Sequence, residues 1–476
     1  METSDLMSKA LKAEAAAATG SDGWRLAFHL MPPIGWLNDP NGLCQCGPTN
    51  HIFFQYNPLG IAPMKQNYWG HYATDDFINY TYYEPGLCCD DPADSNGVYS
   101  GSAVVENDQI RVYYTGNVKH PGNHDYTHTG REHNTMTAVS DDGIHFHDKK
   151  VLLRNSDYPQ DDTLHVRDPK VFTVNGTEYM VLGARRGDDV GEVLVYEKTG
   201  SGQWELINRL TTPDPFGYMW ECPDLYTLDG HTFLSISPQG IEPKGYRYNN
   251  VYQSGTFHLI GDFRDDYALE DFTEYDRGFD FYAPQTYEDN QGRRILIGWM
   301  GLPDIPYQNP TADRGWVHAL TIPRVLTVNE DGVLCQNPLP EFDKLRQWKT
   351  TLSLNGQESG WKDSDCFDAV ITPENGHAPF SVTIRKDCVL DWDGSVFTLS
   401  FGPSGYGRDS RKVELEAITS LRILCDTSSI EIFLNDGSDV FTSRFYPDPE
   451  NSGINIKGLK GSADIWTMNS FYITKN

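Results

Sequence analysis

The chain is a succession of short apolar and aromatic runs, each ended by Gly, Pro, Asn or Asp. Three examples between Trp24 and Leu326 are residues 51–56 (HIFFQY), 109–114 (QIRVYY) and 294–299 (RILIGW). Each run has the length of a β-strand, and no long segment in this range repeats its apolar residues at the 3.6-residue spacing of a helix. The pattern predicts an all-β domain.

A loose internal repeat narrows the fold class further. Segments 74–80 (TDDFINY), 140–146 (SDDGIHF) and 269–275 (LEDFTEY) follow one scheme, and 201–204 (SGQW) is a degenerate version. The aromatic residues that close the four segments are 66, 58 and 71 residues apart. A period of about sixty residues allows one four-stranded sheet per repeat, so roughly 300 residues would hold about five blades of a β-propeller.

The character of the sequence changes near residue 331. Two prolines and a charged run follow, and we interpret them as a linker. Beyond it, residues 421–425 alternate more cleanly, and residues 430–434 lead into Asn435-Asp436-Gly437, a hairpin signal. We expect an N-terminal extension over residues 1–23, a propeller over 24–330, the linker over 331–350 and a smaller β domain over 351–476.

Charge and composition exclude some classes of partner. The 476 residues carry 67 acidic and 38 basic side chains, a formal net charge of −29. A field of that sign repels nucleic acid and anionic membranes, so we expect neither as a partner. No stretch approaches the roughly 18 apolar residues of a membrane-spanning helix. Aromatic residues form 12% of the chain, which suits both stacking on sugar rings and an all-β core.

The cysteines and the N-terminal residues indicate the compartment. The chain has nine cysteines, an odd number, and they form no compact disulfide framework or zinc-ligand spacing. Residues 1–23 contain no apolar core of a secretory signal. We therefore expect free thiols in a cytoplasmic protein, as a monomer or a homodimer.

Four histidines raise the question of a metal site. His120, His124, His128 and His133 are spaced so that three of them would share one face of a helix. Residues 121–123 (PGN) break such a helix, so we interpret the segment as a polar loop. We expect neither a metal ion nor a cofactor.

One carboxylate lies in a turn-rich heptad, residues 36–42 (WLNDPNG). Pro40 restricts Asp39 to an extended conformation, and Asn41-Gly42 can adopt positive φ, so the chain reverses just after the acid. The heptad would hold a carboxylate rigidly at a strand end, as a nucleophile requires, although it would serve equally well as an ordinary turn.

Two further carboxylates stand beside prolines, in Arg167-Asp168-Pro169 and Glu221-Cys222-Pro223. With these three motifs in this order, the sequence resembles the fructoside-cleaving enzymes of glycoside hydrolase family 32, which carry W-[ML]-N-D-P-N-G, R-D-P and E-C motifs. The resemblance runs from about residue 24 to the end. It implies a five-bladed β-propeller followed by a C-terminal β-sandwich.

The resemblance also implies roles for the carboxylates. Asp39 would be the nucleophile and Glu221 the acid/base of a retaining β-fructofuranosidase, so Asp39 must be ionised while Glu221 carries a proton. Asp168 would bind the 3- and 4-hydroxyls of fructose. Arg167 would hold the Asp168 carboxylate ionised and donate to the sugar.

Further residues are carried over as substrate-binding by their motifs. They are Trp36, Asn38, Gln55, Trp69, Tyr99, Ser100, Asp280, Tyr282 and Trp299. For Trp69 and Trp299, packing within a blade is an equally good interpretation.

The substrate is the least determined part of the hypothesis. Where many extracellular relatives have an aromatic residue, this chain has Met64 followed by Lys65, which resembles the intracellular branch that hydrolyses sucrose 6-phosphate. Lys65 is therefore a candidate phosphate ligand. The alternatives are sucrose itself, hydrolysis of inulin or levan, fructosyl transfer to another sugar, and a non-catalytic fructan-binding propeller.

Overall fold

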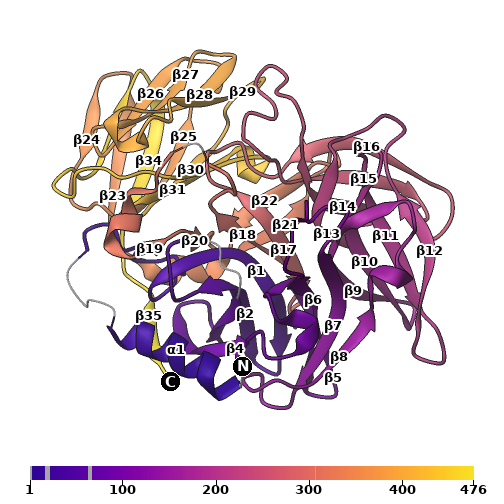
Figure 1. Ribbon diagram of the computed structural model, residues 1–476. Helices are drawn as coiled ribbons and strands as arrows, with labels where there is room; N and C mark the ends of the chain where they lie inside the picture. The colour runs from indigo at the N-terminus through magenta and orange to yellow at the C-terminus, as the bar shows by residue number, and fades with distance from the viewer. Residues whose placement is uncertain (1–2, 17–21, 63–66, 306) are drawn as a thin grey trace.

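The computed structural model describes residues 3–16, 22–62, 67–305 and 307–476. Apart from one α-helix and short 3-10 helices, its regular elements are β-strands, arranged as a large body of sheets that continues into a smaller one (Figure 1). Lys65 lies outside the described residues. All nine cysteines lie within them, and all are free thiols. The one described α-helix has 14 residues and is no candidate for spanning a membrane.

Five antiparallel sheets form the larger body, and each takes its strands in chain order. Blade 1 contains β1 (Gly35–Cys46), β2 (Thr49–Asn57), β3 (Tyr68–Thr74) and β4 (Asn79–Leu87). Blade 2 contains β5 (Val98–Glu106), β6 (Gln109–Lys119), β7 (Arg131–Ser140) and β8 (His147–Leu153). Blade 3 contains β9 (Asp162–Val174), β10 (Thr177–Arg186), β11 (Gly191–Lys198) and β12 (Trp204–Leu210).

Two more sheets complete the set. Blade 4 contains β13 (Met219–Leu228), β14 (His231–Gln239), β15 (Gly255–Gly261) and β16 (Tyr267–Glu274). Blade 5 contains β17 (Tyr282–Glu288), β18 (Arg294–Met300), β21 (Arg324–Val328) and β22 (Leu334–Pro338), with β20 (Ala319–Leu320) beside β18. The first strands contact one another in the closed order β1, β5, β9, β13, β17 and back to β1. The sheets therefore surround one central channel as a five-bladed propeller, which confirms the predicted fold class.

The sequence repeat coincides with the turn between the third and fourth strands of a blade. In blade 1, Asp76 accepts hydrogen bonds from the backbone of Ile78 and Asn79, and Asp142 makes the same turn in blade 2. Such turns favour Asp because its carboxylate binds the backbone two and three residues on. The predicted fourth copy was wrong: residues 269–275 lie mainly in β16, and the matching turn of blade 4 is residues 262–266.

The smaller body consists of two six-stranded sheets. One contains β23 (Arg346–Asn355), β34 (Lys460–Met468), β25 (Phe367–Pro373), β30 (Leu421–Cys425), β31 (Ser429–Leu434) and β32 (Asp439–Arg444). The other contains β24 (Ser359–Trp361), β33 (Ile454–Lys457), β26 (Phe380–Ile384), β27 (Cys388–Trp392), β28 (Val396–Phe401) and β29 (Ser410–Glu414). Apolar side chains from both sheets form a common core, so the body is a β-sandwich. Within the expected linker, residues 334–338 form the outer strand of blade 5. The 3-10 helix Pro340–Leu345 then connects this strand to the first strand of the sandwich.

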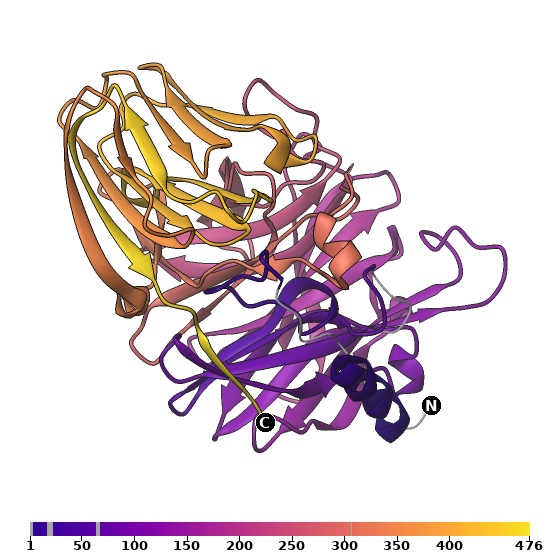
Figure 2. The same cartoon turned by 90° about the vertical axis from the view of Figure 1, so that its left-hand side faces the viewer.

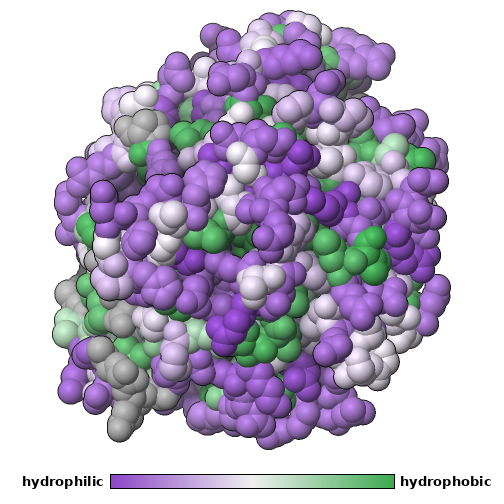
Figure 3. All heavy atoms as spheres, turned by 45° about the vertical axis from the view of Figure 1, so that its right-hand side comes forward, coloured by the Kyte–Doolittle hydropathy of each residue, from purple (hydrophilic) through white to green (hydrophobic). Residues whose placement is uncertain are grey.

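Both ends of the chain pack on blade 1. Helix α1 (Thr3–Ala16) buries Leu6 and Ala10 against the blade, and β35 (Tyr472–Lys475) pairs in parallel with β4 (Figure 2). Buried Glu14 accepts hydrogen bonds from the Tyr82 hydroxyl at 2.7 Å and from the Lys475 ammonium at 2.8 Å. The inner edge of the same blade pairs with β19 (Trp316–Val317). The face of the molecule in Figure 3 is mostly hydrophilic, as the composition leads one to expect.

A fully buried charge cluster joins the propeller to the sandwich. The Arg324 guanidinium of blade 5 lies 3.3 Å from an Asp276 oxygen and donates to Glu431 of the sandwich at 3.1 Å. His29 lies between Glu431, at 3.0 Å, and Asp426, at 2.8 Å. Burial disfavours the imidazolium, but the hydrogen bonds and negative charges of the two carboxylates outweigh burial and raise the pKa of His29.

We expect the substitution Arg324→Met to destabilise the protein strongly. It leaves Glu431 and Asp276 in a dry interface without their cation, a change that costs about 3–5 kcal/mol. The matched control is Arg264→Met, which removes an exposed ion pair with Asp262 and should change little. Urea unfolding followed by tryptophan fluorescence measures both. Equal effects of the two substitutions would contradict a role for the cluster in joining the bodies.

Candidate active site

The first strand of every blade is irregular at the same level of the channel. Its pairing with the second strand shifts register between residues 37 and 40 in β1, 98 and 101 in β5, 167 and 170 in β9, 221 and 224 in β13, and 282 and 285 in β17. A residue before proline ordinarily has negative φ, yet Asp168, Cys222 and Ala283, each followed by proline, have φ of 63°, 47° and 47°. Backbone strain of this kind clusters at functional sites.

The irregularities bring at least one side chain from each first strand to one cavity. Five of these residues, one from each blade, are Asp39, Ser100, Asp168, Glu221 and Tyr282. The cavity has a volume of about 320 Å³. The predicted residues Trp36, Asn38, Gln55, Arg167 and Trp299 line it as well. The three predicted catalytic carboxylates therefore meet in one place, although they come from three blades.

Asp39 is held by two side-chain donors. The Ser100 hydroxyl donates to Oδ2 at 2.6 Å, and the Asn38 amide donates to Oδ1 at 3.2 Å. Asn38 is itself fixed by the Trp36 indole N–H at 2.9 Å. Burial raises the pKa of Asp39 to about 6, because the nearby negative charge of Glu221 adds to burial while the Ser100 and Asn38 hydrogen bonds only partly offset it.

Cys222 lies between the carboxylates of Asp168 and Asp39. Its backbone N–H donates to Asp168 Oδ2 at 2.9 Å, and its sulfur lies 3.6 Å from the same oxygen and 3.8 Å from Asp39 Oδ2. The positive φ at Cys222 is what turns this N–H toward Asp168. Burial raises the pKa of Asp168, which the Arg167 charge opposes and the Glu221 charge reinforces.

Glu221 has donors on both carboxyl oxygens. The Arg167 guanidinium binds Oε1, with its Nε at 3.0 Å. The Tyr282 hydroxyl and the Gln239 amide donate to Oε2 at 2.6 and 2.7 Å. Arg167 was expected to hold Asp168 ionised: its Nε lies 3.9 Å from Asp168 Oδ2, and its charge opposes the rise that burial causes in the pKa of that carboxyl. Its hydrogen bonds go to Glu221, a pairing that the sequence did not predict. The side chain of Glu221, on β13, points toward Arg167, whereas the side chain of Asp168, on β9, points toward Cys222.

Aromatic residues and one amide form the remaining walls. Trp36 packs edge to face against Trp299, with ring centroids 6.0 Å apart, and both rings contact His318. Gln55 is buried, donates to the Val98 carbonyl at 3.0 Å and accepts from the Asn67 amide at 3.1 Å. The orientations of Trp36, Trp299 and Gln55 are therefore fixed before any ligand binds.

Two predicted substrate-binding residues do not line the cavity. Trp69 is fully buried between blades 1 and 2 and donates to the Tyr99 carbonyl at 3.2 Å, so it supports a wall from behind. Asp280 is buried at the contact with the sandwich, where it binds Arg408, the Arg444 backbone at 2.8 Å and the Tyr307 hydroxyl at 3.0 Å. The prediction that they form the pocket surface is wrong for both.

Several lining residues were not predicted from the sequence. Asn67, Arg131, Pro303 and Asp304 line the cavity, and Gln239 holds Glu221. Arg131 begins β7 and Asp304 follows β18, and neither belongs to a local motif. Asn67 lies two residues before Trp69, so the predicted role of Trp69 was the sequence signal nearest to Asn67.

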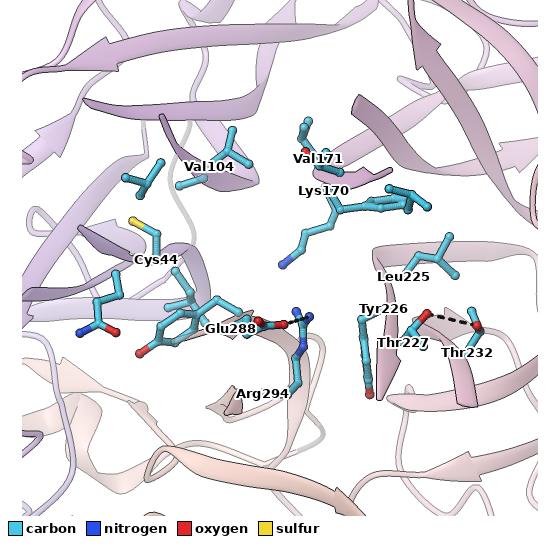
Figure 4. A pocket seen from close by; sticks show the side chains of 18 of the residues that line it. Cys44, Val104, Lys170, Val171, Leu225, Tyr226, Thr227, Thr232, Glu288 and Arg294 are labelled. Carbon is cyan, nitrogen blue, oxygen red and sulfur yellow. Dashed lines mark hydrogen bonds and ion pairs between the residues drawn. The ribbon is translucent and has the colours of Figure 1, made fainter. Parts of the chain in front are cut away.

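A second, larger cavity lies further along the same first strands (Figure 4). Its volume is about 660 Å³, and its lining includes Cys44, Val104, Val171 and Leu225, which follow the catalytic residues of their strands. Its two cations have acidic partners: Lys170 lies 3.3 Å from Asp224, and Arg294 lies 3.3 Å from Glu288. None of the three predicted catalytic carboxylates lines it, so the smaller cavity is the candidate active site.

A five-bladed propeller whose channel opens on three carboxylates defines a carboxylate-dependent glycoside hydrolase. The family model described as "Glycosyl hydrolases family 32 N-terminal domain" matches residues 29–338, and "Glycosyl hydrolases family 32 C terminal" matches residues 346–472. The chain therefore belongs to glycoside hydrolase family 32.

Relatives with named activities are similar over almost the whole chain. A sucrose-6-phosphate hydrolase of Bacillus subtilis (strain 168) is 38% identical over 468 residues, which cover 94% of this chain and 95% of the relative. A raffinose invertase of Escherichia coli is 35% identical, with coverages of 94% and 95%. The structure of a sucrose-6-phosphate hydrolase from Lactobacillus gasseri matches with a TM-score of 0.88 at 27% identity, covering 99% of this chain and 98% of that one.

We expect the acid limb of the pH–activity profile to depend on Ser100. If Asp39 must be ionised, kcat/KM rises as the pH passes through about 6. The Ser100 hydroxyl favours the ionised form, so Ser100→Ala should move the limb to higher pH by about 1–2 units. The control is Ser102→Ala, because Ser102 lies in the same strand but donates to the Pro169 carbonyl. A limb that stays in place, or moves to lower pH, would contradict the assignment.

Proposed function

We propose that this chain is a retaining β-fructofuranosidase that hydrolyses sucrose-type fructosides, including sucrose 6-phosphate, through a covalent fructosyl-enzyme intermediate. The observation that carries the proposal is the meeting of Asp39, Asp168 and Glu221 in one cavity, with a different set of partners for each. The names of the relatives support the substrate class, and a structurally similar Bombyx mori GH32 beta-fructofuranosidase, with a TM-score of 0.81 at 26% identity, has been solved with sucrose.

In the first step, an oxygen of the Asp39 carboxylate attacks C2 of the fructosyl unit. The bond from C2 to the glycosidic oxygen breaks, and Glu221 gives its proton to that oxygen as the leaving sugar departs. In the second step, Glu221 accepts a proton from water, the water oxygen bonds to C2, and the ester bond to Asp39 breaks. Two inversions at C2 give net retention of configuration.

The neighbours of each carboxylate hold it in the orientation that its role requires. Ser100 and Asn38 hold Asp39 in one orientation, as attack along a fixed line requires. Asp168 receives the Cys222 N–H on Oδ2, and its other oxygen, which accepts no hydrogen bond from a described residue, is available to fructose hydroxyls. Tyr282, Gln239 and Arg167 fix the plane of the Glu221 carboxyl beside the leaving oxygen.

The stereochemistry of transfer tests the mechanism. We expect hydrolysis of sucrose in the presence of methanol to yield methyl β-D-fructofuranoside, because the solvent attacks an intermediate whose anomeric centre is already inverted. Proton NMR at early times distinguishes the anomers. Asp39→Asn and Glu221→Gln should each lower kcat by several orders of magnitude. The α-anomer as the first product, or near wild-type turnover by Asp39→Asn, would refute the proposal.

The substitution Asp39→Asn should also make the folded protein more stable at neutral pH. The folded-state pKa of Asp39, about 6, lies above its unfolded value of about 3.9, so its favourable contribution is complete below about pH 4 and is lost as the pH rises through 6. The carboxylate faces an open cavity, which screens it, so we expect Asp39→Asn to gain about 1–2 kcal/mol at pH 7.5 and much less near about pH 4.5.

Urea unfolding at the two pH values measures this gain. The control is Asp76→Asn, because backbone amides outweigh burial there and lower the pKa of Asp76, which gives the opposite sign. A gain at Asp39 that did not change with pH would mean that its ionisation is not disfavoured by the fold.

A further inference from the structure

We propose that the Arg131 guanidinium, on the rim of the catalytic cavity, binds a phosphate group carried by the leaving sugar. The inference rests on the proposed function and extends it to one residue and one class of substrate, a sucrose phosphorylated on its glucose unit. Three observations carry it: the lack of an acidic partner for Arg131, the cationic surroundings of this wall, and its position relative to Glu221.

Arg131 is a cation without a carboxylate. No Asp or Glu of the described chain lies within ion-pair distance of it, and its Nε is buried without any hydrogen-bond partner there. The neighbouring arginines differ: Arg167 binds Glu221, and Arg185 binds Asp189 at 2.6 Å. Holding a half-buried guanidinium without an anion is unfavourable, and acids outnumber bases by 67 to 38 in this chain. An unpaired arginine in such a protein indicates an anionic ligand.

The wall around Arg131 is positively charged. Its Nη1 lies 3.4 Å from His165 Nδ1, which also lies 2.6 Å from Arg167 Nη1, so one imidazole nitrogen faces both guanidinium groups. Burial and then the charges of Arg167 and Arg131 lower the pKa of His165 to about 2. Burial and Arg131 likewise lower the pKa of His133 far below its ordinary value. Both histidines are therefore neutral, and Arg131 is left for an anionic ligand.

Close to Arg131 the electrostatic field attracts anions, although the net charge of the whole protein repels them. The net charge of −29 repels a dianion at long range. Screening limits that repulsion to about 8 Å at physiological salt, so a group inside the cavity is governed by its immediate neighbours. A phosphate at Arg131 meets cations, whereas a phosphate on the cavity floor meets Asp39 and Asp168.

The position of Arg131 fits the leaving group. Arg167 links Arg131, through His165, to Glu221, the proposed donor of a proton to the leaving oxygen. Arg131 therefore lies beyond the acid/base on the side where the departing glucose unit must lie. Tyr99 lines the cavity on this side, with its ring 5.8 Å from His133. In sucrose 6-phosphate the phosphate is on the glucose unit, so it can reach Arg131 while fructose occupies the floor.

Among the described residues, the other charged groups near the channel do not offer the same site. Asp304 lines the cavity from blade 5 and would repel phosphate on that side. In the second cavity along the channel, Lys170 and Arg294 both have carboxylate partners. The charge pattern thus selects the blade 2 wall for a phosphate.

The test compares two substrates in three variants. The measured quantity is kcat/KM for sucrose 6-phosphate divided by kcat/KM for sucrose. We expect Arg131→Gln to lower this ratio by about 10- to 100-fold, because a charge-assisted contact to phosphate is lost. Arg131→Lys should recover part of it. The matched control Arg185→Gln removes a nearby cation that has an acidic partner, and should change the ratio by less than about threefold.

Binding and a second isomer separate the outcomes. Arg131→Gln should weaken competitive inhibition of sucrose hydrolysis by glucose 6-phosphate and leave inhibition by glucose less affected, and wild type should prefer sucrose 6-phosphate to the isomer phosphorylated on fructose. An unchanged ratio in Arg131→Gln, an equal fall in Arg185→Gln, or equal wild-type values for sucrose and sucrose 6-phosphate would overturn the inference. Failure of wild type to release fructose from any of these substrates would instead refute the proposed function.

Discussion

The site depends on hydrogen bonds between the first strands of different blades, close to the irregularities that aim the predicted catalytic residues. The Asn41 side chain accepts the Gly101 N–H at 3.1 Å, and the Gly101 carbonyl accepts from Gln285 at 3.0 Å. The Asp224 carboxylate accepts both the N–H and the hydroxyl of Thr286 at 2.8 Å. Register shifts leave backbone groups without their ladder partners, and buried groups of that kind must be satisfied. The contacts that complete the backbone therefore also fix the distances between blades on which the carboxylates depend.

The sequence was informative where one short segment determines both backbone and chemistry. Pro40 and Gly42 shape the turn that presents Asp39, and all three carboxylates came together as their motifs predicted. Motifs that only surround a site were ambiguous. Trp69 stands in the right strand, but a strand side chain points either into the cavity or behind it, and composition alone does not decide which. Asp280 lies in the bend before β17, and its direction is set by its contacts with the sandwich. The hydrogen bonds from Arg167 to Glu221 join blade 3 to blade 4, so no local pattern in blade 3 predicts them.

Arg131 and Asp304 show a different limit of sequence reasoning. Each lies at the end of a strand and reaches the cavity only because a whole blade places it there. Without a fold, Arg131 is one of 38 basic residues, and its lack of an acidic partner is a property of the surrounding space. The structure shows that no described Asp or Glu lies within ion-pair distance of Arg131.

The order of strands in blade 1 has a consequence for synthesis. Its inner edge pairs with β19, near residue 316, and its outer edge pairs with β35, at residues 472–475. The first blade to leave the ribosome is therefore the last to be completed: during translation its inner edge has no partner until residue 316, and its outer edge has none until residues 472–475, after the sandwich strands. A chain that stops before residue 472 leaves the β4 edge without its final partner, so the integrity of the C-terminus is registered at the opposite end of the sequence, on the blade that carries Asp39.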